Sequence, residues 1–260
     1  MKQVNKQDSK TKRFQIIDLL LVIVLLAAGF LRVNGLFWGE NQYLHPDERF
    51  LVWVGTDISP VESLSEYFDT TNSSLNPHNR GHGFYVYGTL PMFITRYIVE
   101  WVYGHSGFTE MTQVGRSLSA LVDLLTVILI YLIAVRVYNR RIAILAAAFS
   151  ALAVLQIQQS HFFTMDTFIN FFTFLAFYFA IRIAADNRAW DFTHNTGESE
   201  EDKNTILLSI SNIFTHPLCL PSLGFGLALG MAVASKLNAA PMALMLPAAY
   251  LIRLVRFPED

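Results

Sequence analysis

The path of this chain through a membrane is decided by residues 84–103, which read FYVYGTLPMFITRYIVEWVY. The segment is as long as a membrane-spanning helix, which needs about 20 predominantly apolar residues. It also contains Pro91, Arg96 and Glu100, so it is a weak candidate for a span. Either it crosses the membrane, or it lies in the outer interface as an amphipathic helix. The two alternatives distribute the positive charges of the chain differently.

Positive charges favour the second alternative, because Lys and Arg in short loops favour the cytoplasmic side. If residues 84–103 cross and the N-terminus is inside, seven Lys and Arg residues lie inside and eleven outside. If they lie in the interface, thirteen lie inside and six outside. The thirteen are Lys2, Lys6, Lys10, Lys12, Arg13, Arg136, Arg140, Arg141, Arg182, Arg188, Lys203, Arg253 and Arg256. The sequence therefore predicts an interfacial helix at 84–103, whose seven aromatic side chains suit headgroup depth.

The composition is that of an integral membrane protein. Hydrophobic residues make up 53% of the chain and the mean hydropathy is +0.36, which is too apolar for a soluble domain of this length. We expect an all-α fold, a polytopic transmembrane helical bundle of about six spans with both termini inside, plus the external juxtamembrane helix. The predicted spans are 14–36, 117–135, 142–159, 167–185, 217–235 and 238–254.

This topology divides the chain and limits its partners. Residues 1–13 form the predicted cytoplasmic N-terminus, and residues 14–260 the transmembrane domain, with an external loop at 37–116 and a cytoplasmic loop at 186–216. The net charge of −2 and the lack of a basic patch interleaved with aromatics argue against a nucleic-acid partner. Cys219 is the single cysteine, which excludes an internal disulfide and a Cys-based zinc cluster.

The predicted topology gathers polar residues at the external face. The sequence His45-Pro46-Asp47-Glu48-Arg49 follows the first span directly. The other members of this group are Arg80, Arg116, His161, Asp166 and Lys236. Charged groups at a bilayer boundary are costly to hold in place and tend to mark function. We therefore predict a functional site at this face.

Asp47 and Glu48 are the candidates for acid–base chemistry. A carboxylate near apolar surface has its charged form disfavoured, which suits a proton acceptor that works near neutral pH. The alternative is that the two acidic residues only begin a helix, where negative charge complements the helix dipole. His45 with Asp47, Glu48 and Asp166 could also coordinate a divalent metal, although no second His at helical spacing accompanies them.

The remaining polar residues each have two interpretations. Asp166 precedes the span that begins at Thr167, so it caps that helix, lines the site, or does both. His161 fits a hydrogen-bonding residue at the boundary better than a ligand. Lys236 either extends its ammonium group to the interface or neutralises a lipid phosphate. Arg116 and Asp123 lie two turns apart on one helix face, which predicts an internal ion pair.

Several stretches, taken in order, resemble the GT-C superfamily of polyprenyl-phosphate-dependent glycosyltransferases. The resemblance is strongest to the branch with the protein O-mannosyltransferases and the bacterial lipid A aminoarabinose transferases. The stretches are Leu44-His45-Pro46-Asp47-Glu48 after the first span, Tyr87-Gly88-Thr89-Leu90-Pro91, Trp101-Val102-Tyr103-Gly104, Arg116-Ser117-Leu118-Ser119-Ala120-Leu121, Val137-Tyr138-Asn139-Arg140-Arg141, Ser160-His161-Phe162 with Asp166, and Gly226-Leu227-Ala228-Leu229-Gly230 with Ser235-Lys236. The ordered set extends over essentially the whole chain.

The resemblance implies an inverting transfer of a sugar from a polyprenyl phosphate in the outer leaflet to an acceptor hydroxyl. By the family's pattern, Asp47 would be the general base and Glu48 would help to position acceptor or donor. Asp166 would line the site, with His45 and His161 near it. The cations available for the departing phosphate would be Lys236, Arg80 and Arg116. The enzyme would be a hexosyl- or pentosyltransferase in a bacterial or archaeal cell membrane, with no cofactor beyond the lipid-linked donor and with a divalent metal left open.

Two departures from the family qualify this picture. The aminoarabinose transferases carry a lysine before the juxtamembrane helix, where this chain has Tyr85-Val86-Tyr87-Gly88. Family members also have many more spans, so a chain that stops at Arg256-Phe257-Pro258-Glu259-Asp260 is expected to be an N-terminal portion, inactive alone. The acceptor is a glycan, a lipid or a protein. The rival functions are a transporter or flippase of lipid-linked sugars, and a non-catalytic scaffold with the same fold.

Overall fold

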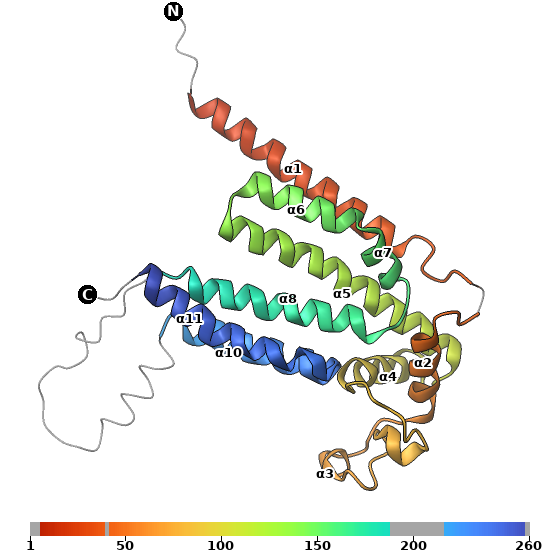
Figure 1. Ribbon diagram of the computed structural model, residues 1–260. Helices are drawn as coiled ribbons and strands as arrows, with labels where there is room; N and C mark the ends of the chain where they lie inside the picture. Colours follow the sequence, from red (N-terminus) through yellow and green to blue (C-terminus); the bar gives the residue numbers. More distant parts are fainter. Residues whose placement is uncertain (1–5, 40–41, 188–215, 258–260) are drawn as a thin grey trace, which may run out of the picture.

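The computed structural model describes residues 6–39, 42–187 and 216–257, and every regular element in these ranges is helical. Long helices run side by side, and the short helices gather at one end of them (Figure 1). The long bundle consists of α1 (Lys6–Val33), α5 (Phe108–Val137), α6 (Arg140–Leu152), α7 (Val154–Ser160), α8 (Met165–Ala184), α10 (Cys219–Ser235), η3 (Leu237–Leu244) and α11 (Met245–Arg256). The end region consists of α2 (Pro46–Asp57), α3 (Leu64–Phe68), η1 (Pro77–Arg80) and α4 (Leu90–Tyr103).

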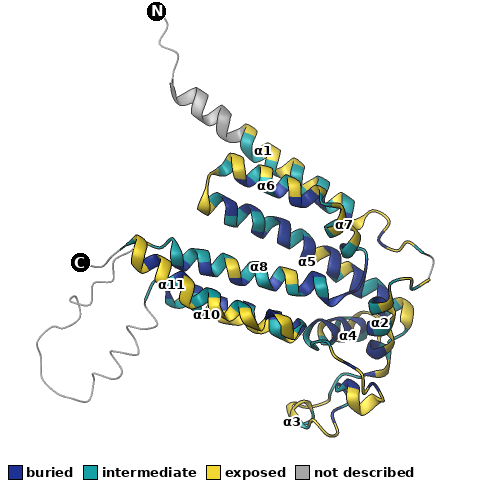
Figure 2. Cartoon of the chain, in the orientation of Figure 1, coloured by how far each residue is buried: buried dark blue, intermediate teal, exposed yellow. Residues whose placement is uncertain are grey.

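The bundle is a helical membrane architecture, as the sequence predicts. Within the described residues, four helical segments are long and apolar enough to cross a membrane: α1, α5, α8, and η3 with α11. The bent pair of α6 and α7 makes a fifth, and α10 is an apolar helix of 17 residues. Buried residues are frequent along α5 at the centre, whereas α1, α10 and α11 carry many exposed ones (Figure 2). Leu26 and Phe30 of α1 are among the exposed apolar side chains, which suits contact with lipid.

The predicted span at 142–159 is broken, which the sequence did not reveal. α6 and α7 meet at Ala153 with a bend of 57°. The bend interrupts the regular helical hydrogen bonds of nearby carbonyl groups: Ser150 O accepts from Ala153 N at 3.3 Å, and Arg32 of α1 supplies further donors. Its Nη1 donates to Ala151 O at 3.1 Å and its Nη2 to Ser150 O at 3.3 Å. A break is tolerated at membrane depth where such partners satisfy the freed backbone groups.

Helical spacing predicts an ion pair between Arg116 and Asp123, and this prediction is wrong. Asp123 Oδ2 instead accepts from Nε of Arg32 at 2.6 Å, and both side chains are buried between α1, α5 and α6. Arg116 pairs with Glu48 of α2. Two turns separate the Cα atoms by about 10 Å, so each residue finds a nearer partner on another helix.

Residues 84–103 form a shorter helix than the sequence predicts. α4 begins at Leu90, with Pro91 in its first turn, and residues 84–89 are not helical. At 1.5 Å per residue α4 is about 21 Å long, which is too short to cross a hydrocarbon core of about 30 Å. Arg96 joins α4 to the end of α2, because its Nε donates to Ile58 O at 3.0 Å. The predicted cytoplasmic loop at 186–216 lies almost entirely outside the described residues.

Candidate functional site

The His45-Pro46-Asp47-Glu48 stretch begins α2, and its local structure separates the two carboxylates. His45 is the N-cap residue, and its Nδ1 accepts a hydrogen bond from Asp47 N at 3.2 Å. Pro46 follows in the first turn, where the absence of its N–H costs no helical bond. Consecutive helical residues project roughly 100° apart. Asp47 is therefore half-buried at one side, whereas Glu48 points into the protein and is fully buried.

Glu48 forms a bidentate ion pair with Arg116 of α5. Nε and Nη2 of Arg116 donate to the two carboxylate oxygens of Glu48, each at 2.7 Å. Phe163 N, in the turn before α8, donates to Oε1 of the same carboxylate at 2.9 Å. Nη1 of Arg116 donates to the carbonyls of Leu36 and Trp38 after α1. The Glu48–Arg116 pair thus fastens four segments of the chain together.

These contacts engage the guanidinium group of Arg116, which the sequence suggested as a cation for the donor phosphate. Its side chain is buried, and its guanidinium group already donates hydrogen bonds to Glu48 and to two carbonyl groups. A phosphate would have to displace Glu48 to reach it. The structure therefore gives Glu48 and Arg116 the geometry of supporting residues, which hold the start of α2 in place.

Tyr87, which the sequence predicted only as one of the interfacial aromatics, lies near Asp47. The Tyr87 hydroxyl lies near the carboxylates of Asp47 and Asp166, whose negative charges act on it. Partial burial raises the pKa of Tyr87, and the negative charges of Asp47 and Asp166 raise it further. Tyr87 therefore stays protonated at neutral pH and has a hydroxyl proton available for a nearby acceptor. The nearest signal in the sequence was its place two residues before the resembling Thr89-Leu90-Pro91 stretch.

Asp166 and Lys236 form the second pair of the site. Lys236 Nζ lies 2.7 Å from Asp166 Oδ1, and both side chains remain partly exposed. The prediction that Asp166 caps α8 is wrong, because the N-cap residue is Thr164 and Asp166 lies in the first turn. Lys236 ends α10 and directs its ammonium group to this carboxylate. A pair at the surface can exchange its partners more cheaply than a buried one.

Gly88 connects the two pairs. Its N–H donates to Ser235 O at 3.0 Å, beside Lys236, and its own carbonyl accepts from the Tyr85 hydroxyl at 2.8 Å. A Cβ atom at Gly88 would lie 2.0 Å from Ala234 O, so only glycine permits this approach. We call Asp47, Tyr87, Asp166 and Lys236 the polar cluster. Its members come from α2, the segment before α4, α8 and the end of α10.

Gly88→Ala is expected to destabilise the protein by about 1–3 kcal/mol, because the added methyl group meets rigid backbone rather than a movable side chain. Thermal unfolding of the purified protein in a phospholipid nanodisc measures the change. Gly226→Ala is the matched control: it lies on α10, where a Cβ atom meets nothing within 4 Å. Equal melting temperatures for the two variants would contradict the close approach.

The other predicted site residues lie outside the polar cluster. The ring nitrogens of His161 face the carbonyls of Ile157, at 2.7 Å, and Asn34, at 3.0 Å, so His161 joins α7 to the segment after α1. Arg80 is exposed in η1, where its Nε donates to Ser74 O at 3.4 Å. The loop around it meets the far end of α2, because His82 pairs with Asp57 at 2.8 Å. That end is about 15 Å along the helix from Asp47.

The four-residue metal set is not assembled. In the ranges that the structure describes, no three His, Cys, Asp or Glu residues lie close enough to hold one ion. His45 uses Nδ1 for its cap, and Glu48 is held by Arg116. An open, mostly apolar hollow of about 410 Å³ lies beside Asp47 on α2 and is lined by Pro46, Arg49, Phe50, Trp53 and Phe108.

A helical membrane bundle with a polar cluster at one end is the class that the fold and the site define. A family model described as dolichyl-phosphate-mannose-protein mannosyltransferase matches residues 94–194. This match confirms the predicted family resemblance and supports a GT-C-type membrane glycosyltransferase in general. The matched range contains Arg116 and Asp166. No curated protein and no solved structure matches the chain significantly.

Proposed function

We propose that this protein is an integral-membrane glycosyltransferase that moves a sugar from a polyprenyl-phosphate donor to an acceptor hydroxyl on the extracytoplasmic face. The observation that carries the proposal is the polar cluster, which brings a half-buried carboxylate, Asp47, near the Tyr87 hydroxyl and near a pair that contains an ammonium group, Lys236. Transfer from a lipid phosphate needs a proton acceptor for the attacking hydroxyl and a cation for the leaving group. The family match to mannosyltransferases supports the same reaction class.

Asp47 is the proposed general base. The acceptor oxygen attacks the anomeric carbon as its proton passes to the Asp47 carboxylate. The bond between the anomeric carbon and the phosphate oxygen breaks, and its electron pair leaves with the phosphate. Because attack and departure take place on opposite faces of the sugar, the configuration inverts. In this proposal the protonated Tyr87 hydroxyl, which lies near Asp47, donates a hydrogen bond to the carboxylate and orients it toward the acceptor.

Lys236 is the proposed cation for the phosphate. Its side chain is one-third exposed, and among the described side chains its ammonium group pairs with Asp166 alone, so a phosphate oxygen can approach without opening a buried pair. Negative charge that accumulates on the phosphate in the transition state is stabilised by a cation already in position. Asp166 keeps that cation at the end of α10 when no donor is bound.

The charge distribution supports the proposed extracytoplasmic location. Thirteen Lys and Arg residues fall inside when residues 84–103 stay on the outer side, and α4 is too short to cross. At the opposite end of the bundle, Arg140 of α6 pairs with Asp18 of α1. The polar cluster lies at the end where α2 and α4 gather, which this topology places outside.

A reconstituted transfer assay tests the proposal. Phospholipid vesicles that carry the protein are supplied with polyprenyl-phosphate mannose or a polyprenyl-phosphate pentose, together with candidate glycan, lipid and peptide acceptors. We expect release of polyprenyl phosphate in step with formation of an inverted glycoside. Movement of intact donor between leaflets without release would instead identify a transporter, and no reaction with any donor would favour a scaffold.

A further inference from the structure

A second hollow lies where the loop around α3 packs against the start of α4. It has a volume of about 260 Å³. Its lining residues are Tyr67, Phe68, Thr70, Ser73, Leu75, Asn76, Pro77, Thr89 and Phe93. None of them belongs to the polar cluster, and none of them is used by the proposed transfer.

The walls of this hollow are held by hydrogen bonds within the loop. Asn76 Nδ2 donates to Thr70 O at 2.8 Å, and Asn79 Nδ2 donates to Ser73 O at 3.0 Å. Ser74 Oγ donates to Ser59 O at 3.0 Å and joins the loop to the segment after α2. Because the backbone is already fixed, a ligand would lose little affinity to ordering of the loop.

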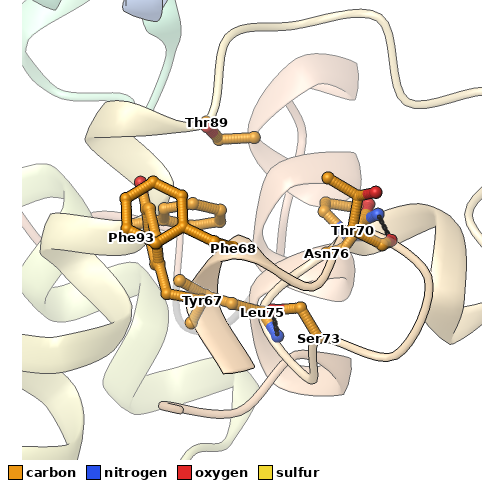
Figure 3. A pocket seen from close by; sticks show the side chains of 9 residues that line it. Tyr67, Phe68, Thr70, Ser73, Leu75, Asn76, Thr89 and Phe93 are labelled. Atoms are coloured by element: carbon orange, nitrogen blue, oxygen red, sulfur yellow. Dashed lines mark hydrogen bonds between the residues drawn. The ribbon is translucent and has the colours of Figure 1, made fainter. Parts of the chain in front are cut away.

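Aromatic rings form one part of the lining. Tyr67 lies edge-on to Phe68, at 5.2 Å between ring centroids, and to Phe93 of α4, at 6.4 Å. In Figure 3 the rings of Phe68 and Phe93 lie together, away from Thr70 and Asn76. Phe68 is 74% exposed although it is a large apolar side chain. Exposed rings beside a hollow offer flat apolar faces to a ligand.

Hydroxyl groups form the other part. Thr89 occupies the N-cap position of α4 but makes no side-chain cap bond. Within the described part of the chain, its hydroxyl and that of Thr70 have no hydrogen-bond partner. A hydroxyl group both donates and accepts. No charged side chain lines the hollow. The lining therefore complements a neutral ligand that has an apolar face and several hydroxyl groups.

We propose that this hollow binds one uncharged pyranose ring of a saccharide. The C–H face of a pyranose would stack on Phe68 or Phe93, and its hydroxyl groups would bond to Thr70 and Thr89. A phosphate or carboxylate finds no cation here, and a hydrocarbon chain gains nothing from the free hydroxyls. The volume falls below the roughly 300–1,000 Å³ of pockets for drug-sized ligands, which suits a single ring.

Saturation-transfer NMR on the full chain in phospholipid nanodiscs tests the proposal, with sugar detergents and glycolipids excluded throughout. Methyl α-D-mannopyranoside and methyl β-D-glucopyranoside are the probes. We expect saturation transfer to their ring protons, and about tenfold weaker binding in Phe68→Ala from the loss of one stacking face. Thr89→Val, which keeps the shape of the side chain, is expected to weaken binding while the melting temperature stays unchanged.

Two controls make the result decisive. Trp101→Ala removes an aromatic side chain that is 86% exposed on the same helix α4 but does not line the hollow, so binding should be unchanged. Asp47→Asn removes the proposed general base and should also leave binding unchanged, which separates this proposal from the proposed transfer. No saturation transfer to either glycoside, or a signal that Phe68→Ala does not weaken, overturns the proposal. So does Phe68-dependent binding of n-decanol without binding of the glycosides, because that identifies an acyl-chain site.

Discussion

Glu48→Gln is expected to lower the free energy of unfolding by about 3–5 kcal/mol, because it leaves the buried guanidinium of Arg116 without a counter-charge. The carboxylate accepts three hydrogen bonds, two from Arg116 and one from Phe163 N. A glutamine side chain has one oxygen, and its amide group would face a donor of Arg116 or Phe163. Denaturant titration in mixed phospholipid–detergent micelles measures the loss.

Glu100→Gln is the matched control for this prediction. Glu100 also pairs with an arginine at 2.7 Å, but its side chain is 42% exposed and its partner is Arg96 on the same helix. Although Arg96 is buried, the half-exposed carboxylate of Glu100 leaves this pair only partly desolvated, so we expect a smaller loss than for the fully buried Glu48–Arg116 pair. In a second comparison, Glu48→Leu combined with Arg116→Met should recover most of the stability, since it removes both charges together. Equal losses for Glu48→Gln and Glu100→Gln would show that the buried pair does not fasten the fold.

The helical membrane architecture could be predicted because composition and segment length act locally. The bend at Ala153 could not, because the sequence there contains neither proline nor glycine. The freed carbonyls are satisfied by Arg32, which comes from a helix more than a hundred residues earlier. The start of α4 was misplaced for a related reason. The segment before Leu90 is held extended by the contact of Gly88 with the end of α10, which no local pattern encodes.

The candidate site shows the same division between local and distant causes. Charge distribution alone grouped Asp47, Asp166 and Lys236 at one end, and the structure brings Asp166 and Lys236 into contact. The adjacent residues Asp47 and Glu48 are equivalent in sequence, and only the position of Arg116 on α5 separates an accessible carboxylate from a buried one. Tyr87 was missed because a neutral side chain adds nothing to a charge count. Its position near Asp47 and Asp166 comes with the close approach of the next residue, Gly88, to the end of α10, which lies far along the chain.

Asp47→Asn is expected to reduce sugar transfer by about 10²–10⁴-fold, the contribution of a well-placed general base, without loss of folding. An asparagine side chain has nearly the same shape and keeps one acceptor oxygen near Tyr87, and the N–H at position 47 still bonds to Nδ1 of His45. The substitution therefore removes the proton acceptor and keeps the local structure. The reconstituted assay with a polyprenyl-phosphate sugar measures the change, and thermal unfolding verifies that the variant is folded.

Asp57→Asn separates a catalytic effect from a general effect of losing a carboxylate on α2. Asp57 lies at the other end of the same helix, is 43% exposed on its side chain, and bonds to Nε2 of His82 through an oxygen that asparagine retains. Transfer should stay within about twofold of the unsubstituted protein, since less than 0.5 kcal/mol of transition-state stabilisation is at stake. If Asp47→Asn transfers sugar as fast as Asp57→Asn, Asp47 is not the proton acceptor. The base would then have to be sought at Asp166, the other carboxylate of the polar cluster, whose release from Lys236 by an arriving phosphate would free it for that role.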